Sequence, residues 1–341
     1  MRLPYKGKGG MAFEPGKCWC YASLVLRFPR ARVALLLCAA SLPGHLVLAT
    51  EANSPGPDKQ TSGYLEVGGS RIYYETRGLG PAIVLLHDGL LHAVTWDEVW
   101  QPLAARHEVI RYDRRGYGRS ELPTGSYSPT KDLWKLLAHL KVQHAVIVGS
   151  SSGGALAIDF AIAYPRMVDG LFLIGPVLYG MEYRAEFRER ANHNNEPMER
   201  DDVKAWARNW SQDRFLIAAA NEPARRRVYE QLVANAEKLK KYDNALEEKL
   251  SPPASGRLSE IRAPTLILVG DADIVDVHTH AAAINAGIRD SEREVIKGTG
   301  HLLQLEKPDE VVKKLEDFAE RWDLKKVTSD ELGISEKMLR R

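Results

Sequence analysis

Three consecutive serines, Ser150–Ser152, lie between glycines directly after a run of β-branched residues, in the stretch AVIVGSSSGGALAIDFAIAYP (145–165). Only one register of this stretch fits the pattern G-x-S-x-G, and it is centred on Ser151. A residue at a very tight turn from strand to helix has a strained backbone, so the residues two positions away, Gly149 and Gly153, must lack side chains that would collide. The spacing therefore predicts that Ser151 is a nucleophile at the edge of a sheet, and that its two serine neighbours are small turn residues.

A serine hydroxyl becomes a good nucleophile only when a base takes its proton and a carboxylate orients that base. The stretch GTGHLLQLEKP follows a predicted strand and places His301 in a glycine-containing loop before a helix. The stretch LVGDADIVDV follows another strand and offers three carboxylates, Asp271, Asp273 and Asp276. Because α/β sheets carry their functional groups directly after strands, we expect His301 to be the general base and Asp273, or one of its two neighbours, to orient it.

Backbone N–H groups must stabilise the oxyanion that forms when a serine attacks a carbonyl. Ser152 follows the predicted nucleophile at the start of a helix, so its amide is the first candidate donor. The second donor is expected in the turn after the strand AIVLLHDG (82–89), from Gly89 or its neighbour Leu90. An ordinary turn is the alternative interpretation of the HDG sequence alone.

Buried strands alternate with helices on both sides of the serine motif. The apolar runs are typical of strands buried on both faces, and they occur in AIVLLHDG, HEVIRYDRRGYG, HAVIVG and GLFLIGP. Helical spacing is present between them, in TWDEVWQPLAARH, SPTKDLWKLLAHLKV and GALAIDFAIAYP. Ahead of them, YLEVGGSRIYYETRG predicts a hairpin joined at Gly68-Gly69. We therefore predict an α/β protein with a mostly parallel sheet and helices on both faces.

The alternation stops after Val177 and resumes with PTLILVGDAD. Residues 178–261 are rich in charge, and amphipathic helices are predicted there in DDVKAWARNW and ARRRVYEQLVANAEKLKKY. We interpret this segment as a helical insertion, rather than a separate terminal domain, in one core that comprises residues 64–177 and 262–323. Residues 324–341 are expected to be a charged C-terminal tail.

The composition is that of a soluble globular protein, with 44% hydrophobic and 27% charged residues in 341. Residues 53–341 carry 40 basic and 43 acidic side chains, so a nucleic-acid partner is not expected. All three cysteines lie in the first 52 residues. The body of the chain therefore uses no disulfide, thiol nucleophile or cysteine-ligated metal.

Residues 1–52 have the order of zones that is typical of a secretory signal peptide. Basic residues at 27–32 precede an apolar stretch, Val33–Ala40, and small residues follow. The apolar stretch is too short and too interrupted for a stable membrane span. We expect export to the periplasm or medium, with an uncleaved membrane anchor or a cytoplasmic location after a mis-chosen start codon as alternatives. Residues 53–63 are expected to be a linker.

Taken together, these motifs resemble the α/β-hydrolase fold superfamily, specifically its lid-bearing serine hydrolases of the carboxylesterase and enol-lactonase type. The likeness covers residues 64–322 and implies an eight-stranded, mostly parallel sheet, with the insertion at 178–261 as a helical cap, or lid. Five stretches carry it in order: the HDGL turn at 87–90, YDRRGYGRS like D-x-R-G-x-G-x-S, the serine elbow, VGDAD like G-x-x-D, and GTGH like G-x-G-H. The G-x-x-D register selects Asp273 over Asp271, because Asp273 lies three residues after Gly270.

The resemblance also implies a reaction. Relatives with aspartate at the nucleophile position dehalogenate alkanes or open epoxides, whereas a serine at 151 points to acyl transfer to water. The implied substrate is a small carboxylic ester or lactone, with His301 moving the proton, Asp273 holding its imidazole, and the amides of Gly89 and Ser152 stabilising the oxyanion. No metal or organic cofactor is implied. Two alternatives remain: the same triad cleaving C–C or amide bonds or catalysing perhydrolysis, and a slow or non-catalytic ligand sensor on the same fold.

This sequence departs from the family pattern at two positions near the implied oxyanion hole. Asp88 stands where many relatives have glycine, and we expect its carboxylate to point away from the hole and stabilise a loop. Ser152 stands where relatives frequently carry a larger residue, which would widen the acyl side of the pocket. Asp113 and Arg115 of the DRRGYGRS stretch are interpreted as structural residues that brace loops near the site.

Overall fold

The computed structural model describes residues 60–331, with side chains described as far as residue 321. The predicted leader, most of the predicted linker and the end of the predicted tail lie outside these residues. Among the described residues, no helix is long and apolar enough to cross a membrane.

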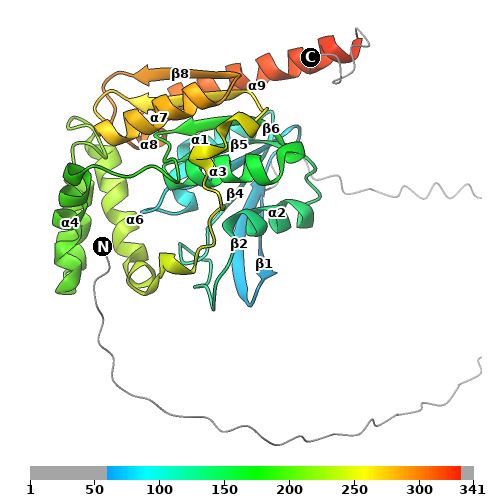
Figure 1. The fold of residues 1–341 in the computed structure, drawn as a ribbon. Helices are drawn as coiled ribbons and strands as arrows, with labels where there is room; N and C mark the ends of the chain where they lie inside the picture. Colours follow the sequence, from blue (N-terminus) through cyan, green and yellow to red (C-terminus); the bar gives the residue numbers. More distant parts are fainter. Residues whose placement is uncertain (1–59, 332–341) are drawn as a thin grey trace, which may run out of the picture. The chain divides into compact units, whose positions relative to one another are not determined.

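One eight-stranded sheet forms the centre of the described chain (Figure 1), in the order β1-β2-β4-β3-β5-β6-β7-β8. Its strands are β1 (Thr61–Val67), β2 (Ser70–Arg77), β3 (Ala82–Leu86), β4 (Glu108–Tyr112), β5 (Ala145–Ser150), β6 (Val168–Ile174), β7 (Thr265–Gly270) and β8 (Ser291–Ile296). The hairpin β1–β2 is antiparallel and pairs antiparallel with β4, and every other neighbouring pair is parallel. The predicted mostly parallel sheet is confirmed.

Helices cover both faces of the sheet, as predicted. Apolar side chains of α2 (Pro129–His139), α3 (Ser152–Ala163) and α7 (Val275–Gly287) share one buried cluster with the strands. On the opposite face, α1 (Asp97–Leu103), α8 (Leu303–Glu306) and α9 (Pro308–Glu331) contribute to a second cluster. Side chains on both faces of the central strands are buried in this way, and this explains why the sequences of these strands are continuous apolar runs.

Two boundaries differ from those expected from the sequence. Strand β1 begins at Thr61, inside the segment expected to be a linker, because Thr61 pairs with Thr76 and extends the hairpin ladder. Helix α9 continues to Glu331, past the expected start of the tail at residue 324. Residues 324–331 contain no proline or glycine, so the sequence has no residue there that ends a helix.

Three α-helices lie between β6 and β7, namely α4 (Ala185–Glu199), α5 (Val203–Gln212) and α6 (Glu222–Lys241), followed by three short 3₁₀ turns at Asn244–Leu246, Ala254–Gly256 and Leu258–Glu260. A further short 3₁₀ turn, Ala93–Trp96, precedes α1, and another, Pro165–Met167, follows α3. The helices of the insertion enclose an apolar cluster that includes Trp206 and Trp210. Leu91, from the turn after β3, and Leu302, beside His301, belong to the same cluster, so the insertion packs on loops at the carboxyl ends of the strands.

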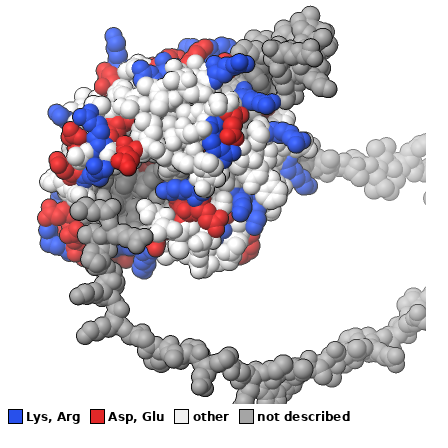
Figure 2. Space-filling model, in the orientation of Figure 1, with Lys and Arg blue, Asp and Glu red and all other residues white. Residues whose placement is uncertain are grey.

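Charged side chains of both signs are interspersed over the face that Figure 2 shows.

Candidate active site

Ser151 lies at the turn between β5 and α3, as the glycine spacing predicts. Its backbone has φ 53° and ψ −118°, a strained conformation for a residue with a side chain. A Cβ atom at Gly149 would collide with the carbonyl oxygen of Gly153, and one at Gly153 would collide with the carbonyl oxygen of Leu86. Both glycines are therefore needed for this turn, and the turn leaves Ser151 partly exposed at the sheet edge.

His301 and Asp273 form a hydrogen-bonded pair at the same sheet edge. His301 follows β8, Asp273 follows β7, and Nδ1 of the imidazole lies 2.7 Å from Oδ2 of the carboxylate. The Asp273 side chain is buried, and its other oxygen accepts the backbone N–H of Ile274 at 2.7 Å. The carboxylate is thus held in place on both sides, and the Nε2 atom of the ring is left for another partner.

The other two candidate aspartates hold loops. Asp271 Oδ1 accepts the backbone N–H of Gly298 at 2.8 Å and that of Thr299 at 3.3 Å, and so braces the loop that carries the histidine. Asp276 Oδ1 accepts the N–H of Arg184 at 2.7 Å, at the start of the helical insertion. Of the three aspartates that the sequence left open, Asp273 is the one whose carboxylate contacts His301.

One short segment after β6 brings Ser151 and His301 together. The Ser151 N–H donates to the Ile174 carbonyl at 2.9 Å, and a Cβ on the next residue, Gly175, would lie 2.9 Å from Nδ1 of His301. Gly175 has φ 49°, so this position favours glycine twice over. Within the described residues the Ser151 hydroxyl makes no hydrogen bond to His301. The structure therefore places both residues at one segment but does not join them.

The electrostatics of the pair favour a basic imidazole. Burial lowers the pKa of His301, but the charge of Asp273 and its hydrogen bond raise that pKa, and the net result lies above the ordinary value of 6.5. The Asp88 carboxylate adds a smaller contribution in the same direction, and Arg190 of α4 opposes it. A base with a raised pKa takes up a proton more readily, which is what activation of a serine requires.

Gly89 and Ser152, the predicted oxyanion donors, lie against each other. A Cβ at Gly89 would be 3.1 Å from the Ser152 hydroxyl oxygen, so the turn after β3 contacts the start of α3. The N–H groups of Leu90 and Leu91 both donate to Asp88 Oδ1, at 2.7 and 2.9 Å. The Leu90 amide is thus already used, which leaves Gly89 as the better candidate of the two.

Arg114 is a residue at this site that we did not single out from the sequence. Its Nη1 donates to the Ser152 hydroxyl at 2.8 Å and to the His87 carbonyl at 3.3 Å, so one guanidinium contacts both flanks of the candidate oxyanion hole. Its Nη2 pairs with Glu247, from the end of the insertion, at 3.3 Å, and both side chains are buried. The only hint in the sequence is its position between Asp113 and Arg115 in the DRRG stretch.

Asp113 and Arg115 hold loops, as interpreted. Asp113 accepts the N–H of Ala93 at 2.8 Å and that of Arg119 at 2.7 Å. Arg115 forms a buried bidentate pair with Asp132 of α2, at 2.6 and 2.9 Å. Among the residues with described side chains, no three His, Cys, Asp or Glu side chains are grouped so that they could hold a metal ion.

Comparison with known proteins decides the family. Residues 83–314 match the sequence pattern of the alpha/beta hydrolase family, which is more than half of the chain. The chain belongs to this family. The α/β-hydrolase fold expected from the motifs is therefore confirmed by the match together with the sheet topology.

Individual members of the α/β-hydrolase family resemble the chain to different extents. It is 32% identical over 148 residues to the uncharacterized hydrolase YraK of Bacillus subtilis, covering 40% of this chain and 55% of that protein, so the match spans about half of the relative's length. It is 28% identical over 269 residues to 2-hydroxy-6-oxo-6-phenylhexa-2,4-dienoate hydrolase of Comamonas testosteroni, covering 72% of this chain and 90% of that one. Among solved structures, Est816, an N-acyl homoserine lactone degrading enzyme, superposes with a TM-score of 0.61 at 27% identity, covering 75% of this chain and all of that one.

The two oxygens of Asp88 differ in their surroundings at the candidate site. One oxygen stabilises the loop, as expected, through the Leu90 and Leu91 amides. The other, Oδ2, is buried and accepts no hydrogen bond from any described residue. Its charge nevertheless reaches His301 and contributes to the raised pKa of the imidazole. Because Asp88 precedes Gly89, its charge would also oppose negative charge that formed at the candidate oxyanion hole.

We expect Asp88→Asn to improve hydrolytic activity at acidic pH. Asparagine keeps the Oδ1 acceptor for the two amides and removes the charge. The acid limb of the pH–rate profile should then move to lower pH, and kcat should rise about two- to tenfold, which corresponds to roughly 0.4–1.4 kcal/mol. Steady-state kinetics between pH 5 and 9 measure both quantities. An unmoved limb would mean that the Asp88 charge does not act on His301.

Proposed function

We propose that the protein is a serine hydrolase that cleaves small carboxylic esters or lactones through an acyl-enzyme on Ser151. The observation that carries the proposal is the strained Ser151 at the start of α3, beside the segment on which the Asp273–His301 pair is packed. The names of relatives give further support, because esterases and lactone-degrading enzymes are among them.

The proposed reaction has two steps, and each step transfers the acyl group from one oxygen atom to another. Ser151 Oγ attacks the carbonyl carbon while His301 Nε2 takes the hydroxyl proton, and Asp273 accepts the Nδ1–H of the imidazolium. The Gly89 and Ser152 amides donate to the oxyanion. The C–O bond of the ester then breaks, and His301 gives its proton to the leaving alkoxide. Water attacks the acyl-enzyme in the same way and releases the acid, which for a lactone still carries the alcohol group.

A fluorophosphonate probe tests the nucleophile, and a panel of esters and lactones tests the reaction. The full chain should be labelled at Ser151, as mapped by mass spectrometry of tryptic peptides, and should turn over members of the panel repeatedly. Labelling elsewhere would contradict the assignment of the nucleophile. Labelling at Ser151 without steady turnover, together with ligand-induced thermal shifts, would favour the sensor alternative.

Arg114 is proposed as a positioning residue for this reaction, since it contacts Ser152 on one flank of the oxyanion hole and the His87 carbonyl on the other. Arg114→Lys retains the charge but cannot make both contacts together with the pair to Glu247. We expect kcat for ester hydrolysis to fall about 10- to 100-fold with little change in KM, because a displaced donor weakens binding of the transition state more than binding of the substrate.

The neighbouring residue offers a matched control. Arg115→Lys also breaks a buried bidentate pair, with Asp132, at a place where neither side chain contacts the candidate site. This variant should lower Tm and leave kcat near the wild-type value. Equal losses of kcat in both variants, in proportion to their losses of stability, would show that Arg114 acts only on the fold.

A further inference from the structure

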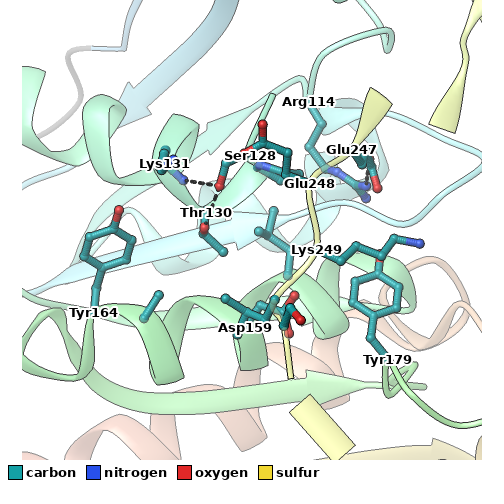
Figure 3. A pocket seen from close by; sticks show the side chains of 15 residues that line it. Arg114, Ser128, Thr130, Lys131, Asp159, Tyr164, Tyr179, Glu247, Glu248 and Lys249 are labelled. Atoms are coloured by element: carbon teal, nitrogen blue, oxygen red, sulfur yellow. Dashed lines mark hydrogen bonds and ion pairs between the residues drawn. The ribbon is translucent and has the colours of Figure 1, made fainter. Parts of the chain in front are cut away.

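A cavity lies beside α3, and the candidate catalytic triad does not line it. Its volume is about 260 Å³, and it is lined by residues of α3, by the start of α2 and by residues 247–251 near the end of the insertion (Figure 3). Ser151, Asp273 and His301 do not line it. The Arg114–Glu247 pair forms one wall and contributes no net charge there.

A buried carboxylate without a full set of partners lies in this cavity. Asp159, from α3, is only 4% exposed, and its Oδ1 accepts no hydrogen bond from any described residue. Burial raises the pKa of Asp159 to about 7, against the lowering effects of Lys249, the Leu250 amide and Arg257 and with a further rise from Glu247. A buried carboxylate with one oxygen unpartnered is costly, and a cation that donated a hydrogen bond to that oxygen would offset the cost.

The other walls suit a small organic molecule. Leu156 of α3 provides an apolar surface next to Asp159. Figure 3 shows Tyr164 and Tyr179 on opposite sides of Asp159, and Lys249 Nζ lies over the Tyr179 ring, 4.5 Å from its centroid. The aromatic faces can contact hydrocarbon or a cationic group.

We propose that this cavity binds a small primary amine, whose ammonium group donates to Asp159 Oδ1 and whose hydrocarbon part packs on Leu156 and Tyr179. An ammonium group has only hydrogen-bond donors, and its positive charge balances the negative charge of the carboxylate. A hydroxyl group would supply the hydrogen bond without the charge. The proposed amine site uses neither the nucleophile nor the base of the proposed hydrolysis, although Arg114 contacts both sites.

Three four-carbon probes separate charge from shape. The thermal unfolding of the full chain is measured at pH 8 and constant ionic strength with n-butylamine, 1-butanol or butyrate, each from about 1 to 50 mM. Butylamine should raise Tm by a few degrees, and the alcohol and the carboxylate should not. A rise with butyrate, or equal rises with the amine and the alcohol, would overturn the proposal.

Variants locate the site. Asp159→Asn should lose the response to butylamine, whereas Ser151→Ala should keep it, which separates this site from the acyl site. Lys249→Met removes the nearest competing ammonium and should lower the butylamine concentration needed for half of the shift. A full response in Asp159→Asn, or its loss in Lys249→Met, would contradict the proposal.

Thermal unfolding of Asp159→Asn without ligand tests whether this variant folds. A carboxyl group whose pKa is raised on folding stabilises the fold while it is protonated and loses that contribution as pH rises from about 4 to about 7. Without ligand, Asp159→Asn should therefore match the wild type near pH 4 and have the higher Tm at pH 8. A lower Tm at pH 8 would mean that the carboxylate already has a partner, and the proposal would fail.

Discussion

Turnover of p-nitrophenyl acetate by Ser151→Ala is expected to fall by at least about 10³-fold, because the variant lacks the oxygen that forms the acyl-enzyme. Alanine fits the turn no worse than serine, and α3 and β5 are held by contacts that do not involve the hydroxyl. The loss should therefore appear in kcat with no loss of stability. Initial rates and thermal unfolding of the same preparations measure the two effects.

The adjacent serine is the control for this experiment. Ser150 is buried, and its hydroxyl donates to Gln304 at 3.4 Å, pointing into the fold. Ser150→Ala makes the same chemical change one residue away and should retain most of the activity. Undiminished hydrolysis in Ser151→Ala, or an equal loss in Ser150→Ala, would remove Ser151 from the role of nucleophile.

The elbow was predictable from sequence because its cause is steric and local. Gly149 and Gly153 are needed since any Cβ there would meet backbone atoms, and a G-x-S-x-G pattern states this requirement directly. The strands were predictable for a related reason, because burial on both faces leaves a continuous apolar run. A structural feature whose cause lies within one short segment can be predicted from the sequence of that segment.

The contacts around the elbow were not predictable in this way, because they join distant parts of the chain. Arg114 and Glu247 are 133 residues apart, and the sequence around either residue does not predict their contact. The roles of Asp271, Asp273 and Asp276 depend on which carboxylate a loop conformation turns toward His301, so the residues alone left three alternatives. Helix α7 was not predicted, since the threonine, histidines and alanines of VDVHTHAAAINAG give no clear apolar stripe.

The same contrast applies to Asp159. In the sequence it is one acid in the apolar helix GALAIDFAIAYP, and a solvated side chain is the ordinary interpretation of such a residue. Residues 247–251, almost a hundred positions later, cover it and leave the cavity beside it. Local pattern therefore predicts the nucleophile well, and the environment of each charged group requires the fold.

Asp273→Asn is expected to lower kcat about 10³- to 10⁴-fold while leaving the fold intact. The Asp273 carboxylate accepts Nδ1–H and so leaves Nε2 free to take a proton from the serine. An asparagine amide that donates to Nδ1 instead favours the tautomer with the proton on Nε2, which cannot act as a base. The loss of kcat should therefore exceed that of Arg114→Lys and be opposite in direction to the change in Asp88→Asn.

The pH dependence of this variant tests the same arrangement independently. In the wild type, Asp273 holds the pKa of His301 above 6.5, so activity should rise with pH through that raised value as the imidazole loses its proton. Without the Asp273 charge the burial effect dominates, and the residual activity of Asp273→Asn should have its acid limb at lower pH. Asp271→Asn is the matched control, because Asp271 bonds the Gly298 and Thr299 amides and does not contact the ring. That variant should lose stability and keep the acid limb at the wild-type pH. A shift of the limb in Asp271→Asn with none in Asp273→Asn would show that Asp271, and not Asp273, orients the imidazole.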